Sequence, residues 1–349
     1  MEVEKIELTP GFQISRIIKG GWQLSEGHSK RSDTDPIEDM FAFAEAGITT
    51  FDCADIYTGV EELIGKFLVE RKRRLGNNTD IKVLTKFVPD YDVLASINKK
   101  DVERIIDRSL KRLGQERLDM VQFSWWTYTV PRWVEVAHWL AELKQAGKIH
   151  LISATNFNTE ATKQMTAVGI KLSTLQVQYS LLDNRPARSL AALCEEENMY
   201  MLCYGTVAGG FFGKQWVGAP EPFAPFENRS LVKYKLMIDE FGGWELFQEL
   251  LSVLETIAEK HQVDLTNVAS RYVLDRNRVG AIIIGARTIA HLKSNLKVFT
   301  FNLDSDDVYR IETVLSQRKG PSGDVFDIER IKDGPHGSIM KYNLNQQQA

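Results

Sequence analysis

Cysteine is scarce in this sequence, and long apolar runs are missing. The 349 residues include three cysteines, Cys53, Cys194 and Cys203, with no CxxC pair among them. That scatter indicates neither a disulfide framework nor a cysteine zinc site, and it fits a reducing compartment. No apolar run approaches the roughly 20 residues of a membrane span, and the acidic start MEVEKIELTP lacks the apolar centre of a signal peptide. We therefore expect a soluble, cytoplasmic protein.

An excess of basic residues is also missing. The formal net charge is −4 and the pI is about 6.0, so the chain has no overall attraction to nucleic acid or to an anionic membrane. Its basic run ERKRRLG, residues 70–76, is typical of a helix end, where cations suit the helix dipole. With 43% hydrophobic and 26% charged residues the chain is predicted to be globular, and composition leaves its oligomeric state open.

Two functional motifs are absent from the sequence. There is no GxGxxG after an early strand, which a doubly wound dinucleotide-binding sheet would need. The six histidines show no HExxH or other paired spacing, so no catalytic metal is expected.

What the sequence does contain is a regular alternation of short apolar runs with longer amphipathic segments. The expected strands are IIKGG, TTFDCA, IKVLTKF, LDMVQFSWW, IHLISATNF, TLQVQYS, MLCYGT and GAIIIGA. Helical segments lie between them, and several stop at a glycine: Gly47, Gly76, Gly114, Gly147 and Gly169. Eight strands alternating with helices predict parallel pairing through crossover helices, and that number closes a (β/α)8 barrel, the TIM-barrel fold of the α/β class.

Three segments fall outside this alternation. The start, EKIELTPGFQIS, predicts a hairpin around Pro10 and Gly11 that closes the bottom of the barrel. Residues 213–243, after the seventh strand, contain three prolines and are expected to form a long irregular insertion. We expect residues 1–317 to form the barrel with this insertion and residues 318–349 to form a C-terminal tail. The Gly, Pro and charge content of the tail favours a surface arm over a role in the substrate site.

Polar residues gather where the predicted strands end. In a barrel the active site forms at the carboxyl ends of the strands, so these side chains are expected to converge. They are Asp52, Asp55, Tyr57, Lys86, Ser124, Thr155, Asn156, Gln176, Gln178 and Tyr204. Each alone could be structural, but together they indicate a site.

Three of these residues have complementary chemistry. A tyrosine is a poor acid near neutral pH, but an adjacent ammonium lowers its pKa. We therefore expect Lys86 to lower the pKa of Tyr57, and Asp52 to hold Lys86 charged and oriented. Such a tyrosine protonates a developing alkoxide or takes a proton from an alcohol, which suits carbonyl reduction by hydride.

These residues lie in segments that resemble the aldo-keto reductase family. The resemblance covers most of the chain, in the order AGITTFDCADIYTGVEELIGKFL, VLTKF, ISATNF, LQVQYSLLD and IIIGARTIAHLKSNL. It implies a (β/α)8 barrel that binds NADP(H) without a Rossmann fold and acts on a small carbonyl or alcohol substrate. It also implies that Asp52, Tyr57 and Lys86 are three of the four catalytic residues, with Tyr57 as the proton donor.

The resemblance implies a set of cofactor contacts as well. The nicotinamide carboxamide would be held by Thr155, Asn156 and Gln176, and Tyr204 would stack on the ring. Arg287 would grip the 2′-phosphate and so favour NADPH, because a guanidinium forks well onto phosphate oxygens. The whole implied set is Thr155, Asn156, Gln176, Tyr204, Gly205, Gly285, Arg287, His291 and Asn295. His291 and Ser294 depart from commoner family choices.

One catalytic position also departs from the family. The residue that closes the fourth strand is usually a histidine, which donates a hydrogen bond to the substrate carbonyl, and here it is Ser124. A serine hydroxyl is shorter, and losing one such donor can cost on the order of a hundredfold in turnover. His28, on the loop after the first strand, is a candidate to reach the substrate oxygen instead. The aromatic residues expected to wall the pocket are Trp22, Trp125, Trp126 and Tyr128.

Two functional classes follow from these residues. One is an NADPH-dependent oxidoreductase of aldehydes, ketones or sugars, and the other is a cofactor-binding sensor or regulatory protein with weak or no turnover. Ser124 favours the second class. Asp52, Tyr57 and Lys86 favour the first, because burying a lysine and an aspartate together is costly without a use for them. A glycosidase would need two carboxylates flanking one bond, and Asp52 is better explained as the partner of Lys86.

Overall fold

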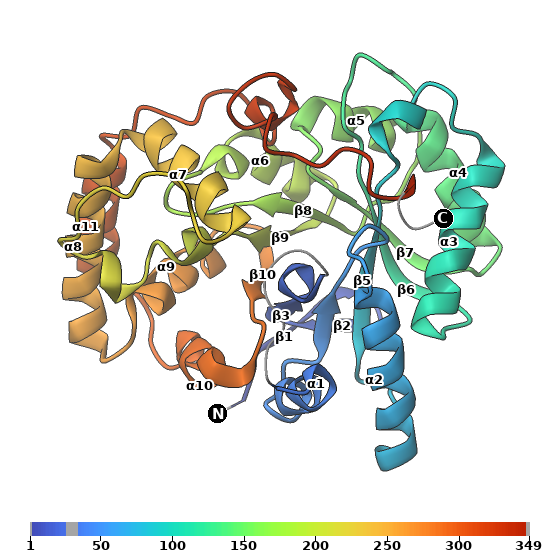
Figure 1. Cartoon of the computed structure of the whole chain (residues 1–349), viewed down its shortest axis with the longest axis horizontal. Helices are drawn as coiled ribbons and strands as arrows, with labels where there is room; N and C mark the ends of the chain where they lie inside the picture. Colours follow the sequence, from blue (N-terminus) through green and yellow to red (C-terminus); the bar gives the residue numbers. More distant parts are fainter. Residues whose placement is uncertain (1, 26–33, 347–349) are drawn as a thin grey trace.

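Eight parallel strands close into a barrel in the computed structural model, which describes residues 2–25 and 34–346 (Figure 1). The strands are β3 (Ile17–Gly20), β4 (Thr50–Asp52), β5 (Lys82–Phe87), β6 (Leu118–Phe123), β7 (Ile149–Thr155), β8 (Thr174–Gln178), β9 (Tyr200–Tyr204) and β10 (Val279–Gly285). Around the barrel the order is β10-β3-β4-β5-β6-β7-β8-β9, and every neighbouring pair is parallel. The predicted (β/α)8 barrel is confirmed.

Helices surround the barrel and bury their apolar faces against it (Figure 1). They are α1 (Pro36–Glu45), α2 (Val60–Leu75), α3 (Lys99–Leu113), α4 (Trp133–Gln145), α5 (Thr159–Ala167), α6 (Ser189–Glu196), α7 (Arg229–Phe241), α8 (Trp244–His261), α9 (Leu265–Leu274), α10 (Leu292–Leu296) and α11 (Ser305–Leu315). All five glycines predicted to stop helices have positive φ, from 63° to 92°, a conformation that glycine adopts without side-chain strain. Within the described residues, no helix combines the length and apolar character of a membrane-spanning segment.

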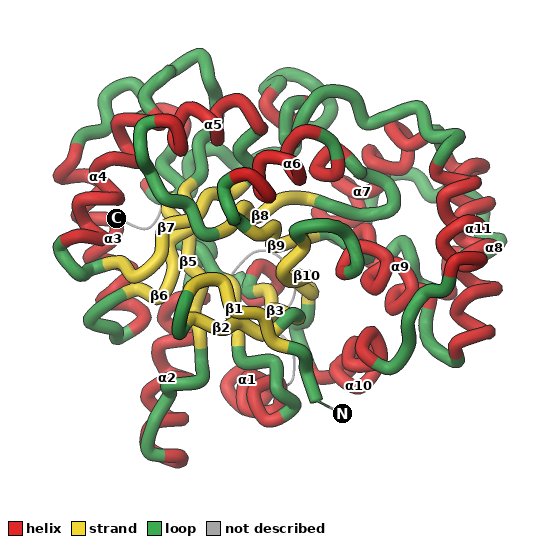
Figure 2. Tube along the Cα trace, turned by 180° about the vertical axis from the view of Figure 1, so that it is seen from behind, coloured by secondary structure: helices red, strands yellow, loops and turns green. Residues whose placement is uncertain are grey.

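The predicted hairpin is present and lies at the amino-terminal end of the barrel. β1 (Lys5–Thr9) pairs antiparallel with β2 (Phe12–Ser15), and Figure 2 shows both strands in front of the barrel strands. Leu8, Phe12 and Ile14 are buried there. They pack against the inward side chains of the barrel, which are Ile18, Leu84, Met120, Leu151, Leu202, Ala281 and Ile283. The hairpin therefore closes this end of the barrel.

The insertion is not irregular throughout. It contains α7, which is capped by Asn228: the Asn228 side chain accepts a hydrogen bond of 3.1 Å from the Leu231 backbone N–H. The buried residues of α7 lie on one helical face: Tyr234, Met237, Ile238 and Phe241. The prediction of an irregular segment was wrong for residues 229–241, because the three prolines all precede the helix and do not interrupt it.

The C-terminal tail is not a surface arm. In Figure 1 it passes from α11 across the molecule, and the described chain ends near α3 and α4. Val325, Phe326, Glu329 and Asn345 of the tail are buried. The predicted surface arm was wrong, because the polar residues of the tail have partners inside the fold.

Ile14→Ala is expected to lower the free energy of unfolding by about 2–5 kcal/mol, because a cavity would replace a side chain packed in the closed end of the barrel. Ile14 is 1% exposed. Its neighbour Gln13 points outward and is exposed, so Gln13→Ala serves as the control and should change stability by less than about 0.5 kcal/mol. Denaturant unfolding followed by circular dichroism measures both variants. Equal, small effects would contradict a closing role for the hairpin.

Candidate active site

Lys86 and Asp52 form a buried ion pair at the carboxyl ends of β5 and β4. Lys86 Nζ lies 2.7 Å from each oxygen of the Asp52 carboxylate and 2.8 Å from the Cys53 carbonyl oxygen. Burial alone would lower the pKa of Lys86, but the negative charge of Asp52 and its hydrogen bonds to the ammonium favour the charged form, and the pKa is raised. Lys86 is therefore charged at neutral pH and held in one direction by Asp52, as predicted from the sequence.

Two glutamines complete the surroundings of Asp52. Gln122 Nε2 donates to Asp52 Oδ1 at 2.9 Å, and Gln176 Nε2 donates to the same oxygen at 2.6 Å. Gln176 also donates to Gln122 Oε1 at 2.9 Å. Sequence reasoning missed Gln122, although alternation along a strand places residues 122 and 124 on one face of β6. Gln176, expected only as a cofactor contact, is also part of the network around Asp52.

Tyr57 lies beside this ion pair, on the loop between β4 and α2. Lys86 Nζ is 5.1 Å from the centre of the Tyr57 ring, and the centre of the Trp22 ring is 5.0 Å from the same point. Burial raises the pKa of Tyr57 to about 12, and the charge of Lys86 opposes this rise only in part. The predicted lowering of this pKa was wrong in its net sign. Tyr57 therefore keeps its proton at neutral pH, which suits a proton donor.

Ser124 is buried directly after the last residue of β6. Its backbone N–H donates to the Phe87 carbonyl oxygen at 3.0 Å, which fixes the backbone of Ser124 beside the end of β5. Since Lys86 immediately precedes Phe87, Ser124 belongs to the same end of the barrel as the ion pair. His28, the other candidate for the fourth position, lies outside the described residues.

The four aromatic residues expected around the pocket differ in their surroundings. Trp125 is 1% exposed, packs in the core and donates from Nε1 to the Val130 carbonyl oxygen at 2.9 Å. Trp126 donates to the Pro89 carbonyl oxygen at 2.8 Å. The guanidinium carbon of Arg330, from the tail, lies 4.0 Å from the centre of the Tyr128 ring. Among the four, Trp22 is the ring that contacts Tyr57.

The residues expected near the nicotinamide are linked to one another at the ends of β7, β8 and β9. The Tyr204 hydroxyl donates to Asn156 Oδ1 at 2.8 Å, and the Thr155 hydroxyl donates to the Gln176 carbonyl oxygen at 3.2 Å. Lys233 of α7 places its ammonium 4.8 Å from the centre of the Tyr204 ring. One face of Tyr204 is thus covered, so stacking on a ligand would use the other face.

Gly205 follows Tyr204 and has a positive φ of 81°. A Cβ at this position would come within 2.2 Å of the Tyr234 hydroxyl oxygen. The insertion helix α7 therefore packs directly on the end of β9, and glycine is what allows this approach.

The residues expected at the adenosine end form a second group after β10. Gly285 ends β10, His291 ends the short 3-10 helix Ile289–His291, and Asn295 lies in α10. Arg287 lies on the connecting loop. Ser294, one of the two departures from the family pattern, has its hydroxyl bonded to Asp264, and its carbonyl oxygen accepts from Asn267 Nδ2 at 2.9 Å. These contacts fasten the segment to the start of α9.

Sequence reasoning also missed the residues that anchor the tail. The Arg185 guanidinium donates to Asp183 at 2.7 and 2.9 Å and to Glu329 at 2.9 and 3.1 Å. All three side chains are at most 1% exposed. Because an unpaired buried charge is strongly unfavourable, Glu329 holds the tail against the loop after β8.

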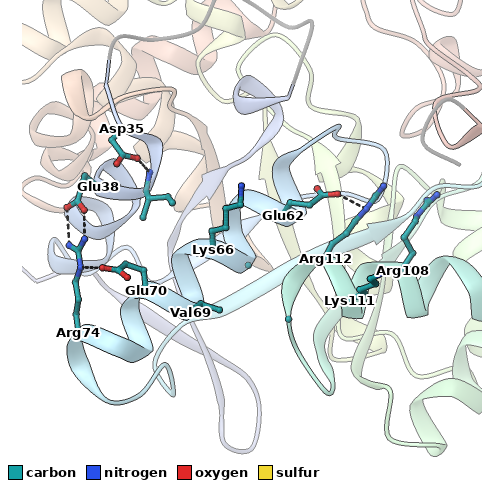
Figure 3. Close-up of a pocket in the computed structure, with 13 residues that line it drawn as sticks. Asp35, Glu38, Glu62, Lys66, Val69, Glu70, Arg74, Arg108, Lys111 and Arg112 are labelled. Atoms are coloured by element: carbon teal, nitrogen blue, oxygen red, sulfur yellow. Dashed lines mark hydrogen bonds and ion pairs between the residues drawn. The ribbon is translucent and has the colours of Figure 1, made fainter.

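A groove of about 950 Å³ lies among the outer helices α1, α2 and α3 (Figure 3). Its rim is ion-paired: Arg74 bonds Glu38 at 2.6 Å and Glu70 at 2.7 Å, and Arg112 bonds Glu62 at 2.8 Å. The groove contains none of the expected site residues. In the part of the chain that the structure describes, no three His, Cys, Asp or Glu side chains are grouped to hold a metal ion.

Asp55, also expected in the site, lies fully buried two residues before Tyr57. Its carboxylate accepts from the Val88 backbone N–H at 3.1 and 3.2 Å and from Asn345 Nδ2 at 2.9 Å. Burial raises the pKa of Asp55 to about 7, although the hydrogen bond from Asn345 opposes this rise. Asp55 thus ties the loop of Tyr57 to the loop that follows Lys86.

Asp55→Asn is expected to flatten the pH dependence of stability. The pKa is raised from 3.8 in the unfolded chain to about 7 in the fold, so between these values the folded state holds a proton that the unfolded state has lost. Stability therefore falls as pH rises through this window, by about 4 kcal/mol in all. Unfolding free energies measured from pH 4 to 8 should show this slope in the wild type and lose it in the variant.

The exposed Asp92 provides a matched control, since Asp92→Asn should keep the wild-type slope. A wild-type slope in Asp55→Asn would contradict the raised pKa.

Comparison with known proteins gives one consistent result. A model of the "Aldo/keto reductase family" matches residues 16–316. Aldo-keto reductase YhdN of Bacillus subtilis is 27% identical over 317 residues, covering 87% of this chain and 91% of that protein. The NADH-specific methylglyoxal reductase of Escherichia coli is 23% identical over 329 residues, covering 88% and 96%. The solved structure of a glycerol dehydrogenase from Gluconobacter oxydans superposes with a TM-score of 0.73 at 23% identity, covering 91% and 97%, and so shares the fold.

Proposed function

The chain belongs to the aldo/keto reductase family, and we propose that it is an NADP(H)-dependent oxidoreductase that reduces aldehydes or ketones, or oxidises alcohols or sugars in reverse. The observation that carries the proposal is the contact of Tyr57 with the buried Lys86–Asp52 ion pair. A protonated phenol beside a fixed ammonium is suited to deliver a proton to a substrate oxygen.

In this mechanism the bound nicotinamide would supply or accept the hydride. Tyr57 donates its hydroxyl proton to the substrate oxygen as negative charge develops there. The Lys86 ammonium then stabilises the phenolate that Tyr57 becomes, while Asp52 keeps Lys86 in place. Because the pKa of Tyr57 is raised to about 12, its hydroxyl group is protonated near neutral pH and is available as the proton donor for reduction.

The residues proposed to hold the cofactor fit this role chemically. Thr155, Asn156 and Tyr204 offer hydroxyl, amide and ring surfaces at neighbouring strand ends. Near the adenosine end, a Cβ on Gly285 would come within 2.3 Å of the Gln23 amide nitrogen. In the described part of the chain, the buried Gln23 Oε1 has no hydrogen-bond partner. An acceptor without a donor next to Gly285 supports a ligand with N–H or O–H groups at this place.

A cofactor-binding protein with weak or no turnover is the second candidate, and Ser124 is the observation that favours it. Its hydroxyl reaches less far than the histidine usual in the family, so the substrate oxygen would be less firmly placed. Turnover of the wild type, of Tyr57→Phe and of Ser124→His separates the two functions.

Tyr57→Phe is expected to lower the turnover number by about 100- to 10,000-fold, because the variant has no proton to donate. NADPH consumption with a panel of aldehydes, quinones, sugars and enones measures it. Tyr309→Phe is the control, since Tyr309 is 71% exposed on α11, and it should match the wild type. The affinity for NADPH should stay within twofold in both variants. Undiminished turnover in Tyr57→Phe would refute the proposed mechanism.

Ser124→His is expected to raise turnover, by up to about a hundredfold, because it adds a longer hydrogen-bond donor for the substrate oxygen. If the wild type turns over no substrate of the panel but binds NADPH, and the histidine variant is active, the second candidate function is correct. Wild-type turnover that depends on Tyr57 supports the enzyme.

Arg287→Ala is expected to weaken NADPH binding by about ten- to a hundredfold, because a charge-assisted hydrogen bond to the 2′-phosphate would be lost. NADH binding should change less than twofold. Lys293→Ala removes an exposed cation from the same segment and should leave both affinities near wild type. Titration of tryptophan fluorescence measures the dissociation constants. An equal loss of affinity for both cofactors would contradict the role proposed for Arg287. A relative that is named as NADH-specific makes this test informative, since cofactor choice differs within the family.

A further inference from the structure

The tail places one fully bonded amide between the two loops that hold the proposed catalytic residues. Asn345 is 7% exposed. Its Nδ2 donates to Asp55 Oδ2 at 2.9 Å and to the Val88 carbonyl oxygen at 2.6 Å. Asp55 precedes Tyr57 by two residues, and Val88 follows Lys86 by two residues. One side chain thus joins the backbone segments on either side of the ion pair.

Arg108 of α3 fixes the direction of this amide. Its Nη2 donates to Asn345 Oδ1, so the oxygen of the amide faces the arginine and both N–H groups face Asp55 and Val88. Figure 3 shows Arg108 and Arg112 extending side by side from α3. Arg112 donates to the Asp55 carbonyl oxygen at 3.2 Å, so one arginine holds the amide and the other holds the loop to which the amide is bonded.

The backbone around Asn345 is also held. Its N–H donates to Asp90 Oδ1 at 2.8 Å, and the N–H of Gln346 donates to Asp90 Oδ2 at 2.7 Å. The Tyr91 N–H donates to the Tyr342 carbonyl oxygen at 2.9 Å. The amide is therefore placed by its own segment of chain and does not depend on a single contact.

We propose that Asn345 is a positioning residue for catalysis, which holds the loop of Tyr57 and the loop after Lys86 at the separation that proton transfer needs. This inference rests on the proposed function. A small displacement of a proton donor lowers the rate steeply, because the reacting atoms must lie within hydrogen-bond reach. Asn345 acts on the rate through Asp55 and Val88, without touching the substrate.

The first test compares Asn345→Ala with Asn343→Ala in the full chain. Asn343 lies two residues away and bonds Asp92 at the surface, at 2.8 Å, so its variant removes a contact of the tail without touching Asp55. Asn345→Ala should lower the turnover number by about tenfold and change the NADPH dissociation constant by less than twofold. Asn343→Ala should match the wild type. Unchanged turnover in Asn345→Ala, or an equal loss in both variants, would overturn the proposal.

Asn345→Asp gives a second readout, the pH dependence of turnover, which a general loosening of the tail would not change. It sets a carboxylate against Asp55, in surroundings that also hold Glu61, Asp90, Arg108 and Arg112. The two carboxyl groups repel each other when both are ionised, but one protonated group can donate to the other. The loss of turnover in this variant should therefore shrink as pH is lowered from 8 to 6, relative to the wild type. A loss of turnover that is the same at every pH would count against a direct contact between residue 345 and Asp55.

Hydrogen exchange separates failure of this inference from failure of the proposed function. In Asn345→Ala, the amides of residues 54–59 and of Val88 should exchange faster than in the wild type. Asn343→Ala loses only its contacts with Asp92 and should leave these amides unchanged. If the wild type turns over no substrate, the proposed function fails, and exchange alone decides whether Asn345 orders the two loops. Unchanged exchange in these segments would overturn the inference in either case.

Discussion

The buried ion pair of Lys86 and Asp52 is the constraint on which the site depends. Removing two charges from water costs several kcal/mol per ion, and this cost is offset only when every donor and acceptor of the pair has a partner. Lys86 meets this condition with three acceptors, the two Asp52 oxygens and the Cys53 carbonyl oxygen. Asp52 meets it with the lysine and the amides of Gln122 and Gln176. These partners come from β4, β5, β6 and β8, so the ion pair is fully satisfied only inside a closed barrel.

The same burial explains why sequence reasoning succeeded for some parts of the site and failed for others. The strands and their polar ends could be predicted, because apolar runs and turn residues are local properties. The sign of the pKa shift of Tyr57 could not, since it is set by competition between burial and the charge of Lys86, and sequence shows only the charge. Gln122 lies between apolar residues of β6. Its partner Asp52 is on another strand, so the sequence alone does not predict the contact between them. The roles of individual residues in cofactor binding stay predictions.

The two segments that were expected to be irregular or exposed form one cover over the carboxyl ends of the strands. The cover consists of α7 and residues 319–346 of the tail, and its parts are joined directly. The Lys319 N–H donates to the Phe241 carbonyl oxygen at 2.9 Å, and His336 Nε2 lies 3.4 Å from Glu240 Oε1. These contacts link residues about 80 to 100 positions apart, which is why local patterns did not indicate them. Within the cover, Lys233 and Arg330 place cationic groups beside Tyr204 and Tyr128.

Closure of the barrel through β3 and β10 has a consequence for the synthesis of the chain on the ribosome. Ile17 pairs with Ile282, so the first barrel strand leaves the ribosome roughly 265 residues before its last neighbour is made. At about 5–20 residues per second this wait lasts on the order of 10 to 50 seconds. During that time one edge of the nascent sheet, rich in isoleucine, has unpaired backbone groups that can pair with another chain. The hairpin at the amino terminus is translated immediately before β3, but most of the barrel side chains that it packs against, from Leu84 to Ile283, are made later, so it gains its buried contacts only as the ring is completed.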